Sequence, residues 1–156
     1  MSWRNQLPKE GSKPEENLWS ILSEMGVAWE PNVPLEDGFT AYGRHVDVLV
    51  EGVLAIEVQS SFHTKSLRER KDVAKRRSIE ASGLAWMELW EDELEKATQV
   101  KAGAEWRPLI KEWIHGMLPY AHRVHDEYVE YQSRLPDPPL LRVPGQGMMR
   151  LDERRL

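Results

Sequence analysis

The chain has 156 residues, a formal net charge of −5 and no cysteine. This length suits one domain that buries roughly two thirds of its unfolded surface. The absence of cysteine excludes disulfides, thiolate metal sites and cysteine nucleophiles, and it suits a reducing compartment such as the cytoplasm. There is no N-terminal apolar run and no apolar stretch of about 18 residues, so neither a signal peptide nor a membrane span is expected.

The first part of the chain alternates helical and strand patterns. Residues 1–12 are polar and indicate a loose arm. A helix is predicted from Ser12, a good N-cap, to about Met25, with an apolar stripe at i, i+3, i+4 and i+7. Residues 27–34 form a predicted edge strand, because two prolines interrupt them. The following elements are expected to be a loop at 35–40, strands at 42–51 and 53–60, a helix at 65–82 with a thin apolar stripe at Leu67, Ala74 and Ala81, a strand at 84–90 and a short helix at 91–97.

The α-β-β-β-α-β order predicts a mixed α/β fold in which helices flank a central mixed sheet. Residues 1–98 are expected to form this core, and residues 99–156 a helical extension. One amphipathic helix is predicted around Trp106–Met117 and a second at Tyr120–Arg134, whereas prolines break any helix between 135 and 147. The extension would pack on the core or on a second subunit, or serve as a partner-binding arm. The sequence leaves these alternatives open.

Two apolar runs in the middle of the chain each contain a carboxylate. Asp47 interrupts His45–Val50, Glu57 interrupts Val53–Val58, and a Glu-Gly pair of hairpin type joins the runs. A buried carboxylate must be paired, protonated or bound to a cation. Strand alternation places Gln59 on the face of Glu57, about 7 Å further along. The pattern predicts an oxygen-ligand site for a hard divalent cation.

Asp47 followed by Glu57-Val58-Gln59 resembles the PD-(D/E)xK nuclease superfamily, in the variant that has Gln in place of Lys. The segment IEVQSS also resembles a strand of competence-protein-like nuclease domains. Two positions depart from the pattern, because Val46 stands where a proline is usual and no lysine follows Glu57 at the usual place.

Three further residues fit the very-short-patch-repair-like branch of that superfamily. Glu15 lies on the first predicted helix, with Glu16 as a near competitor, His63 follows the second strand of the hairpin, and Asp72 lies on the next helix. Taken with the hairpin residues, these positions resemble the pattern called EDxHD in related homing endonucleases. The catalytic set that the resemblance implies is Glu15, Asp47, Glu57, Gln59, His63 and Asp72.

The resemblance implies a restriction-endonuclease-like core and an Mg²⁺-dependent endonuclease that hydrolyses phosphodiester bonds in DNA. Asp47, Glu57 and the Val58 carbonyl would hold Mg²⁺, for which Mn²⁺ could substitute. Gln59 would orient water, and His63 would serve in proton transfer. A nuclease of this size that cuts both strands would often act as a homodimer.

The helix after the hairpin is strongly basic. Lys65–Arg77 contains seven basic residues against two acids, a local charge of +5 in an acidic protein. Such a strip suits docking of one phosphate backbone. The residues expected to contact DNA are Lys65, Arg68, Lys71, Lys75 and Arg76.

Plainer interpretations stay open for each candidate. The strand carboxylates could pair with Arg44 or Lys65, acids favour the first turn of any helix, and Asp72 could pair with Arg68 or Arg76 on its own helix. His122 and His125 at i, i+3 lack a recognised ligand partner and indicate coincidence rather than a metal site. Two other functional classes therefore remain: a nuclease fold that binds nucleic acid or a protein without cutting, and a structural α/β protein with solvated carboxylates.

Overall fold

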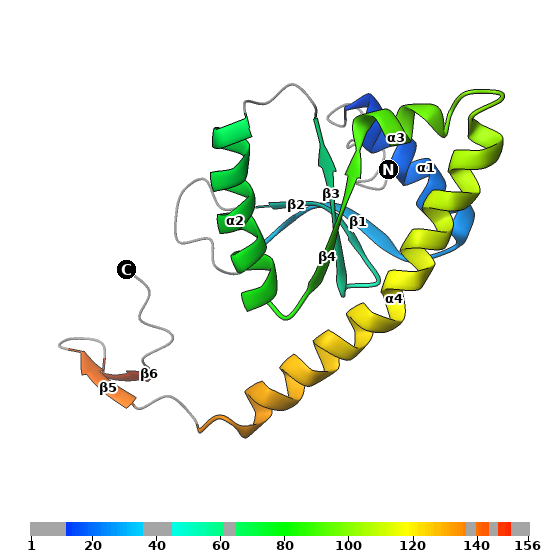
Figure 1. Cartoon of the computed structure of the whole chain (residues 1–156). Helices are drawn as coiled ribbons and strands as arrows, with labels where there is room; N and C mark the ends of the chain where they lie inside the picture. The colour runs from blue at the N-terminus through cyan, green and yellow to red at the C-terminus, as the bar shows by residue number, and fades with distance from the viewer. Residues whose placement is uncertain (1–11, 36–44, 61–64, 137–139, 144–146, 151–156) are drawn as a thin grey trace, which may run out of the picture.

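A four-stranded sheet with helices on both faces forms the centre of the protein (Figure 1). The computed structural model describes residues 12–35, 45–60, 65–136, 140–143 and 147–150, with the side chains of 65–72 and 140–150 left out. The elements are α1 (Lys13–Met25), β1 (Trp29–Pro34), β2 (His45–Val50), β3 (Leu54–Gln59), α2 (Lys65–Ala81), β4 (Ala85–Trp90), α3 (Glu91–Lys96), α4 (Gly103–Arg134), β5 (Leu140–Val143) and β6 (Gly147–Arg150).

The sheet is mixed, and its strands follow the order β1-β2-β3-β4. Antiparallel pairing joins β1 to β2 and β2 to β3, whereas β3 and β4 are parallel and α2 makes the crossover between them. The mixed α/β class and the α-β-β-β-α-β order predicted from the sequence are confirmed. The arm at residues 1–11 and the predicted strand start at 42–44 lie outside the described residues.

The turn between β2 and β3 fixes the register that positions the site. Glu51 and Gly52 both have positive φ angles, 51° and 70°. The Val53 N–H donates to the Val50 carbonyl at 3.0 Å, which closes the turn. Two consecutive residues of positive φ are the signature of the tight hairpin turn that suits twisted strands. The predicted hairpin is therefore confirmed.

The two faces of the sheet bury different amounts of apolar surface. The helices α1, α3 and α4 cover one face, and α2 covers the other (Figure 1). The larger core contains Leu18 and Leu22 of α1, Ile56 of β3 and Ile114 of α4, all fully buried. The smaller core, on the α2 side, centres on Ile79. A thin core under α2 leaves room for polar side chains at its edge.

The apolar stripe predicted for α2 is wrong in part. Among the described side chains of α2, Ile79 is the large apolar one that is buried, at 1% exposure, whereas Ala81 is exposed. Ala74 is half-buried, and the side chain of Leu67 lies outside the described part. The sequence signal was weak because three of the described residues of α2 that are buried or half-buried are charged or polar: Lys75, Arg76 and Ser78.

The long helix α4 corrects the prediction of two separate helices. It continues without a break through Pro108 and Pro119. An interior proline removes one backbone hydrogen bond and disfavours a helix. Here Leu118 and Ala121, on either side of Pro119, are buried against the sheet. This packing holds the helix together across the proline.

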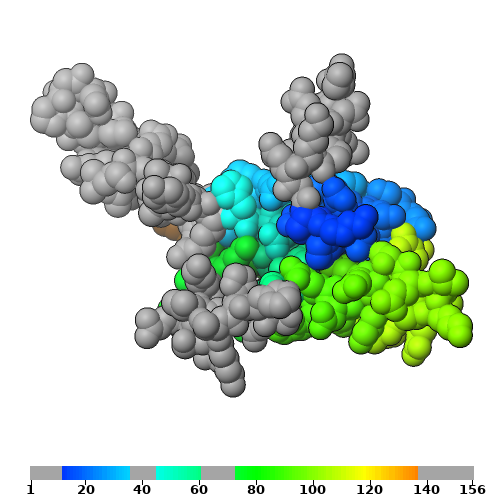
Figure 2. All heavy atoms as spheres, turned by 90° about the horizontal axis from the view of Figure 1, so that it is seen from above, coloured from blue at the N-terminus to red at the C-terminus, as the bar shows by residue number. Residues whose placement is uncertain are grey.

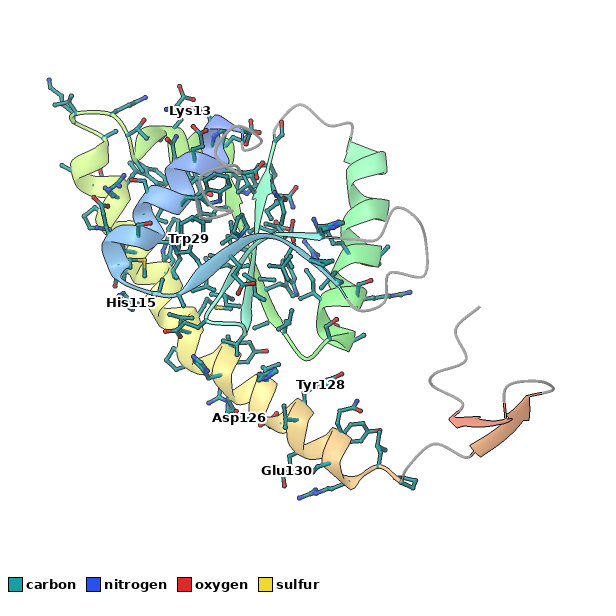
Figure 3. All side chains as sticks on the ribbon, turned by 180° about the vertical axis from the view of Figure 1, so that it is seen from behind. Lys13, Trp29, His115, Asp126, Tyr128 and Glu130 are labelled. Carbon is teal, nitrogen blue, oxygen red and sulfur yellow. The ribbon has the colours of Figure 1, made fainter. Side chains whose placement is uncertain are left out.

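The outer half of α4 extends beyond the sheet, where Asp126, Tyr128 and Glu130 mark its course (Figure 3). The antiparallel hairpin of β5 and β6 follows it and was not predicted, because the prolines around it indicated only irregular structure. None of the helices in the described ranges combines the length and the apolar composition that a membrane span requires.

Gly83, between α2 and β4, is expected to be much less tolerant of alanine than Gly26 at the end of α1. Both have positive φ angles, 75° and 72°. A Cβ on Gly83 would lie 2.3 Å from the Tyr128 ring and 2.8 Å from its Cβ, whereas a Cβ on Gly26 meets no atom within 4 Å among the described residues. Gly26→Ala should therefore lower the free energy of unfolding by about 1–2 kcal/mol, the cost of a side chain at positive φ. Gly83→Ala should lower it clearly more, because it adds the clash with Tyr128.

Urea denaturation of both variants would measure this difference in the free energy of unfolding. Equal losses for the two variants would mean that α4 does not press on Gly83 in solution.

Candidate active site

Asp47 and Glu57 lie together at the point where β2 and β3 separate. The antiparallel register ends at the pair Val48 and Ile56, and Asp47 and Glu57 would form the next pair. Instead, Asp47 Oδ2 accepts a hydrogen bond from the Val58 N–H at 2.9 Å. A side chain thus replaces a backbone group in the ladder, and Glu57 lies on the α2 face of the sheet, where it meets Lys75.

Glu57 is a buried carboxylate with an unusual proton affinity. The residue is 5% exposed, and its Oε1 has no hydrogen-bond partner among the described residues. Burial raises the pKa of Glu57 to about 8, and the charge of Asp47 adds to this rise. Lys75 acts in the opposite direction, since its ammonium favours the ionised form. The described residues therefore leave one oxygen of this carboxyl pair without a hydrogen bond and do not fully offset the cost of burying its charge.

Lys75 of α2 approaches the carboxylate pair from above the sheet. Its Nζ lies 2.6 Å from Glu57 Oε2. Lys75 and Gln59 line the same small pocket, together with Glu57. A lysine is absent from the strand position that Gln59 occupies, and α2 supplies one to the same pocket. The sequence placed Lys75 among the DNA-contacting residues and missed this contact with Glu57, although its position four residues before Ile79 puts it on the sheet-facing side of α2.

Glu15, in the first turn of α1, lies close enough to Asp47 for the two charges to interact. Ser12 caps α1 and donates to Glu15 Oε1 at 2.9 Å. Partial burial raises the pKa of Glu15, the Ser12 hydrogen bond opposes this, and the Asp47 charge raises it further. Figure 2 shows α1 (blue) beside the cyan and teal atoms of β2 and β3. The start of α1 thus faces the separated end of the hairpin.

A third carboxylate, Glu88, lies on β4 beside Glu57, so acids occupy adjacent positions on three neighbouring strands. The parallel register pairs Glu57 with Glu88 on the same face of the sheet. Arg76 Nη2 donates to Glu88 Oε1 at 2.6 Å, and the Arg76 guanidinium lies 4.2 Å from the centroid of the Trp86 ring. Glu88 was missed in the sequence, although the run Ala85–Trp90 carries a carboxylate in an otherwise apolar strand, as the runs of Asp47 and Glu57 do.

Comparison with known proteins gives one likeness of fold. No protein-family model matches the chain, and no curated protein sequence matches it. A search of solved structures finds the catalytic domain of the homing endonuclease I-Bth0305I, which is 21% identical. The TM-score is 0.39, and the match covers 65% of this chain and 98% of that domain. A likeness of this strength does not assign a function, so the site is interpreted from its own geometry.

The donor set fits a hard cation only as a partial site. Within the described ranges, no three Asp, Glu or His side chains converge as ligands. Two carboxylates do converge, and Glu57 Oε1 is buried without a partner. Mg²⁺ is usually held by one or two carboxylates, with waters and substrate phosphates completing its octahedral shell. Asp47 and Glu57 therefore fit Mg²⁺ or Mn²⁺.

The structure does not describe the side chains of several residues that the sequence predicted for the site or for DNA contact. His63 lies outside the described residues, and so do the side chains of Lys65, Arg68, Lys71 and Asp72. The two α4 histidines have separate partners: His122 Nε2 lies 2.7 Å from Glu51 Oε2, and His125 Nδ1 lies 3.3 Å from the Gly83 carbonyl. The two histidines therefore contact different parts of the protein.

Proposed function

We propose that this protein is a metal-dependent endonuclease that hydrolyses phosphodiester bonds in DNA. The observation that carries the proposal is the arrangement of Asp47, Glu57 and Lys75. A structural ion pair needs one carboxylate and one ammonium, whereas here burial raises the pKa of Glu57 to about 8 and the charge of a second carboxylate, Asp47, adds to the rise. Such a conflict between neighbouring charges is typical of sites that bind a cation or perform chemistry.

Asp47 and Glu57 are the proposed cation ligands, and the Val58 carbonyl is a third. The N–H and C=O of one strand residue point toward the same neighbouring strand, so the Val58 carbonyl faces the side on which its N–H meets Asp47. A divalent cation bound there would polarise the scissile phosphate and lower the pKa of the attacking water. As a ligand Glu57 would be ionised, and the cation would then take over from Lys75 the role of balancing its charge.

Lys75, Gln59 and Glu15 have distinct proposed roles around the ligands. Once Glu57 no longer holds it, the Lys75 ammonium can stabilise the charge that develops on the phosphate. The Gln59 amide, in the same pocket, can orient water by hydrogen bonds. Glu15 has a raised pKa and lies near Asp47, so it suits the exchange of a proton with water.

His63 and Asp72 remain proposed members of the site, with His63 in proton transfer and Asp72 as its orienting partner. The proposed DNA contacts are Lys65, Arg68, Lys71, Lys75 and Arg76. A homodimer would place two such sites on the two strands of a duplex.

Asp47→Asn is expected to abolish Mg²⁺- or Mn²⁺-dependent nicking of plasmid DNA. The change removes a ligand charge, while the Asn oxygen can still accept from the Val58 N–H and preserve the fold. Nicking assays with each metal, on plasmid, junction and mismatch substrates, would measure activity. Glu30→Gln is the matched control, because Glu30 is an exposed acid on β1 and its loss should leave nicking unchanged.

Metal binding should be tested separately by thermal unfolding. Millimolar Mg²⁺ or Mn²⁺ should raise the midpoint of the wild type and not that of Asp47→Asn, because a ligand that binds the folded state stabilises it. No shift in the wild type would contradict the metal site.

One observation favours a second candidate, a nuclease fold that binds DNA without cutting it. Glu57 already has a cationic partner, Lys75, at 2.6 Å, and a permanent ion pair would block a cation. Binding of DNA without any cleavage, and without a metal-induced shift of the unfolding midpoint, would select this alternative.

A further inference from the structure

Arg76 is held by two residues of β4 in two different ways. Glu88 Oε1 accepts from Arg76 Nη2 at 2.6 Å, so the guanidinium is bound along one edge. The guanidinium carbon lies over the Trp86 ring, 4.2 Å from the ring centroid. Trp86 and Glu88 are two residues apart on one strand and share a face. The guanidinium therefore has little freedom to turn.

The Arg76 side chain is nevertheless partly exposed. The side chain of Arg76 is 39% exposed, compared with 22% for Glu88. Its Nε is buried and has no hydrogen-bond partner in the part of the chain that the structure describes. A guanidinium carries five N–H donors in a rigid fork that matches phosphate oxygens, so one bond to a carboxylate does not exhaust it.

Arg76 also occupies the right place for a second contact to a DNA strand. It follows Lys75 directly in α2, and both residues line the pocket that contains Glu57 and Gln59. A side chain fixed before binding loses little conformational entropy when it meets its ligand. An arginine that is immobilised at the rim of a phosphate site therefore binds more strongly than a free surface arginine.

We propose that Glu88 and Trp86 are positioning residues that hold Arg76 as a clamp for a backbone phosphate of DNA. The phosphate is a neighbour of the one that would lie at Asp47 and Glu57. This inference rests on the proposed function, since it assigns the clamp to the same DNA strand. Glu88 and Trp86 act on the DNA only through Arg76.

The clamp makes a prediction opposite to that of simple electrostatics. Removal of an acidic charge near DNA normally strengthens binding, because it relieves repulsion of the phosphates. If Glu88 positions Arg76, then Glu88→Gln weakens binding instead, because the neutral amide holds the guanidinium less firmly. Glu80, an exposed acid on α2, is the matched control for the effect of charge alone.

The experiment measures affinity for a short DNA duplex at several salt concentrations, with the full chain in the Asp47→Asn background and without divalent cations. Arg76→Ala should weaken binding roughly tenfold and reduce the slope of log affinity against log salt by about 1. Glu88→Gln and Trp86→Leu should each weaken binding about threefold to tenfold, and Glu80→Gln should leave it unchanged or tighter.

The double variant Arg76→Ala with Glu88→Gln separates positioning from an independent role. It should bind no more weakly than Arg76→Ala alone, because residues that act through one group are not additive. Arg76→Lys keeps the charge but loses the fork and the stacking, so it should resemble Glu88→Gln. Thermal unfolding of every variant checks that the fold persists.

Tighter binding by Glu88→Gln, additive losses in the double variant, or no DNA binding by the Asp47→Asn protein at low salt would each overturn the clamp. Failure of the proposed cleavage is distinguishable, because it would appear as wild-type protein that does not nick DNA while the differences among Arg76, Glu88 and Glu80 variants persist. Failure of the clamp alone would appear as wild-type protein that cleaves DNA, together with a Glu88→Gln variant that binds DNA more tightly.

Discussion

Glu57→Gln is expected to stabilise the protein above pH 7 while it abolishes metal-dependent cleavage. The pKa of Glu57 is raised from 4.5 to about 8 by burial and by Asp47. Between pH 4.5 and about 8, Glu57 has lost its proton in the unfolded chain. In the folded chain it must either keep this proton or carry a buried charge. The folded state binds more protons, so stability falls as pH rises through this window. Glutamine keeps the shape and does not ionise.

The expected gain for Glu57→Gln is on the order of 3–5 kcal/mol at pH 8 and close to zero near pH 4.5, from about 1.4 kcal/mol per pH unit. The side chain of Glu57 is 7% exposed, so solvent screening is small, and Lys75, at 29%, can turn toward water. Urea denaturation at pH 5 and pH 8 would measure the difference.

Glu88→Gln serves as the control, because Glu88 is partly exposed and its loss removes the partner of Arg76 without relieving a buried charge. A loss of stability in Glu57→Gln at both pH values would instead show that Glu57 is a structural anchor for α2. A gain in stability with a loss of activity would mark a residue kept for function.

Lys75→Met is expected to lower kcat by a factor of about 10² or more, with a smaller change in KM. The reason is that the ammonium would stabilise charge that develops at the phosphate during the reaction, not in the bound substrate. Gln59 lines the same pocket, so Gln59→Lys in the Lys75→Met background should restore part of the rate. Single-turnover cleavage kinetics would measure each step.

Arg77→Met is the matched control for Lys75→Met, because Arg77 is an exposed basic residue two positions further along α2. Its loss should weaken DNA binding slightly and leave the rate at saturating DNA unchanged. A rise in KM with unchanged kcat for Lys75→Met would assign Lys75 to DNA binding alone.

The sequence predicted the parts of the site that depend on local pattern. Alternation along one strand put Glu57 and Gln59 on one face, and the Glu-Gly turn brought Asp47 opposite Glu57. The contacts of Lys75 and Glu88 depend on the rotation of α2 over the sheet and on the parallel register between β3 and β4. Neither is encoded within a short window of sequence, so the contact of Lys75 with Glu57 and the place of Glu88 beside Glu57 were not predicted.

The same distinction explains the errors in the fold. Propensity predicted a break at Pro119, but the burial of Leu118 and Ala121 against the sheet outweighs the lost hydrogen bond. Ile79, a buried apolar residue of α2, was not predicted because the charged residues around it hide the period of the helix. Tertiary packing determines both the continuity of α4 at Pro119 and the buried face of α2. Such packing cannot be inferred from a single element before its neighbours are placed.

The hydrogen bond from the Val58 N–H to Asp47 makes one backbone amide depend on a side chain. Most amides in a sheet exchange with solvent hydrogen when strands separate, so their exchange rates report the opening of the sheet. Exchange at Val58 reports the Asp47 carboxylate instead. A single amide within β3 is therefore a natural probe of whether Asp47 is engaged with the backbone or drawn away toward another partner.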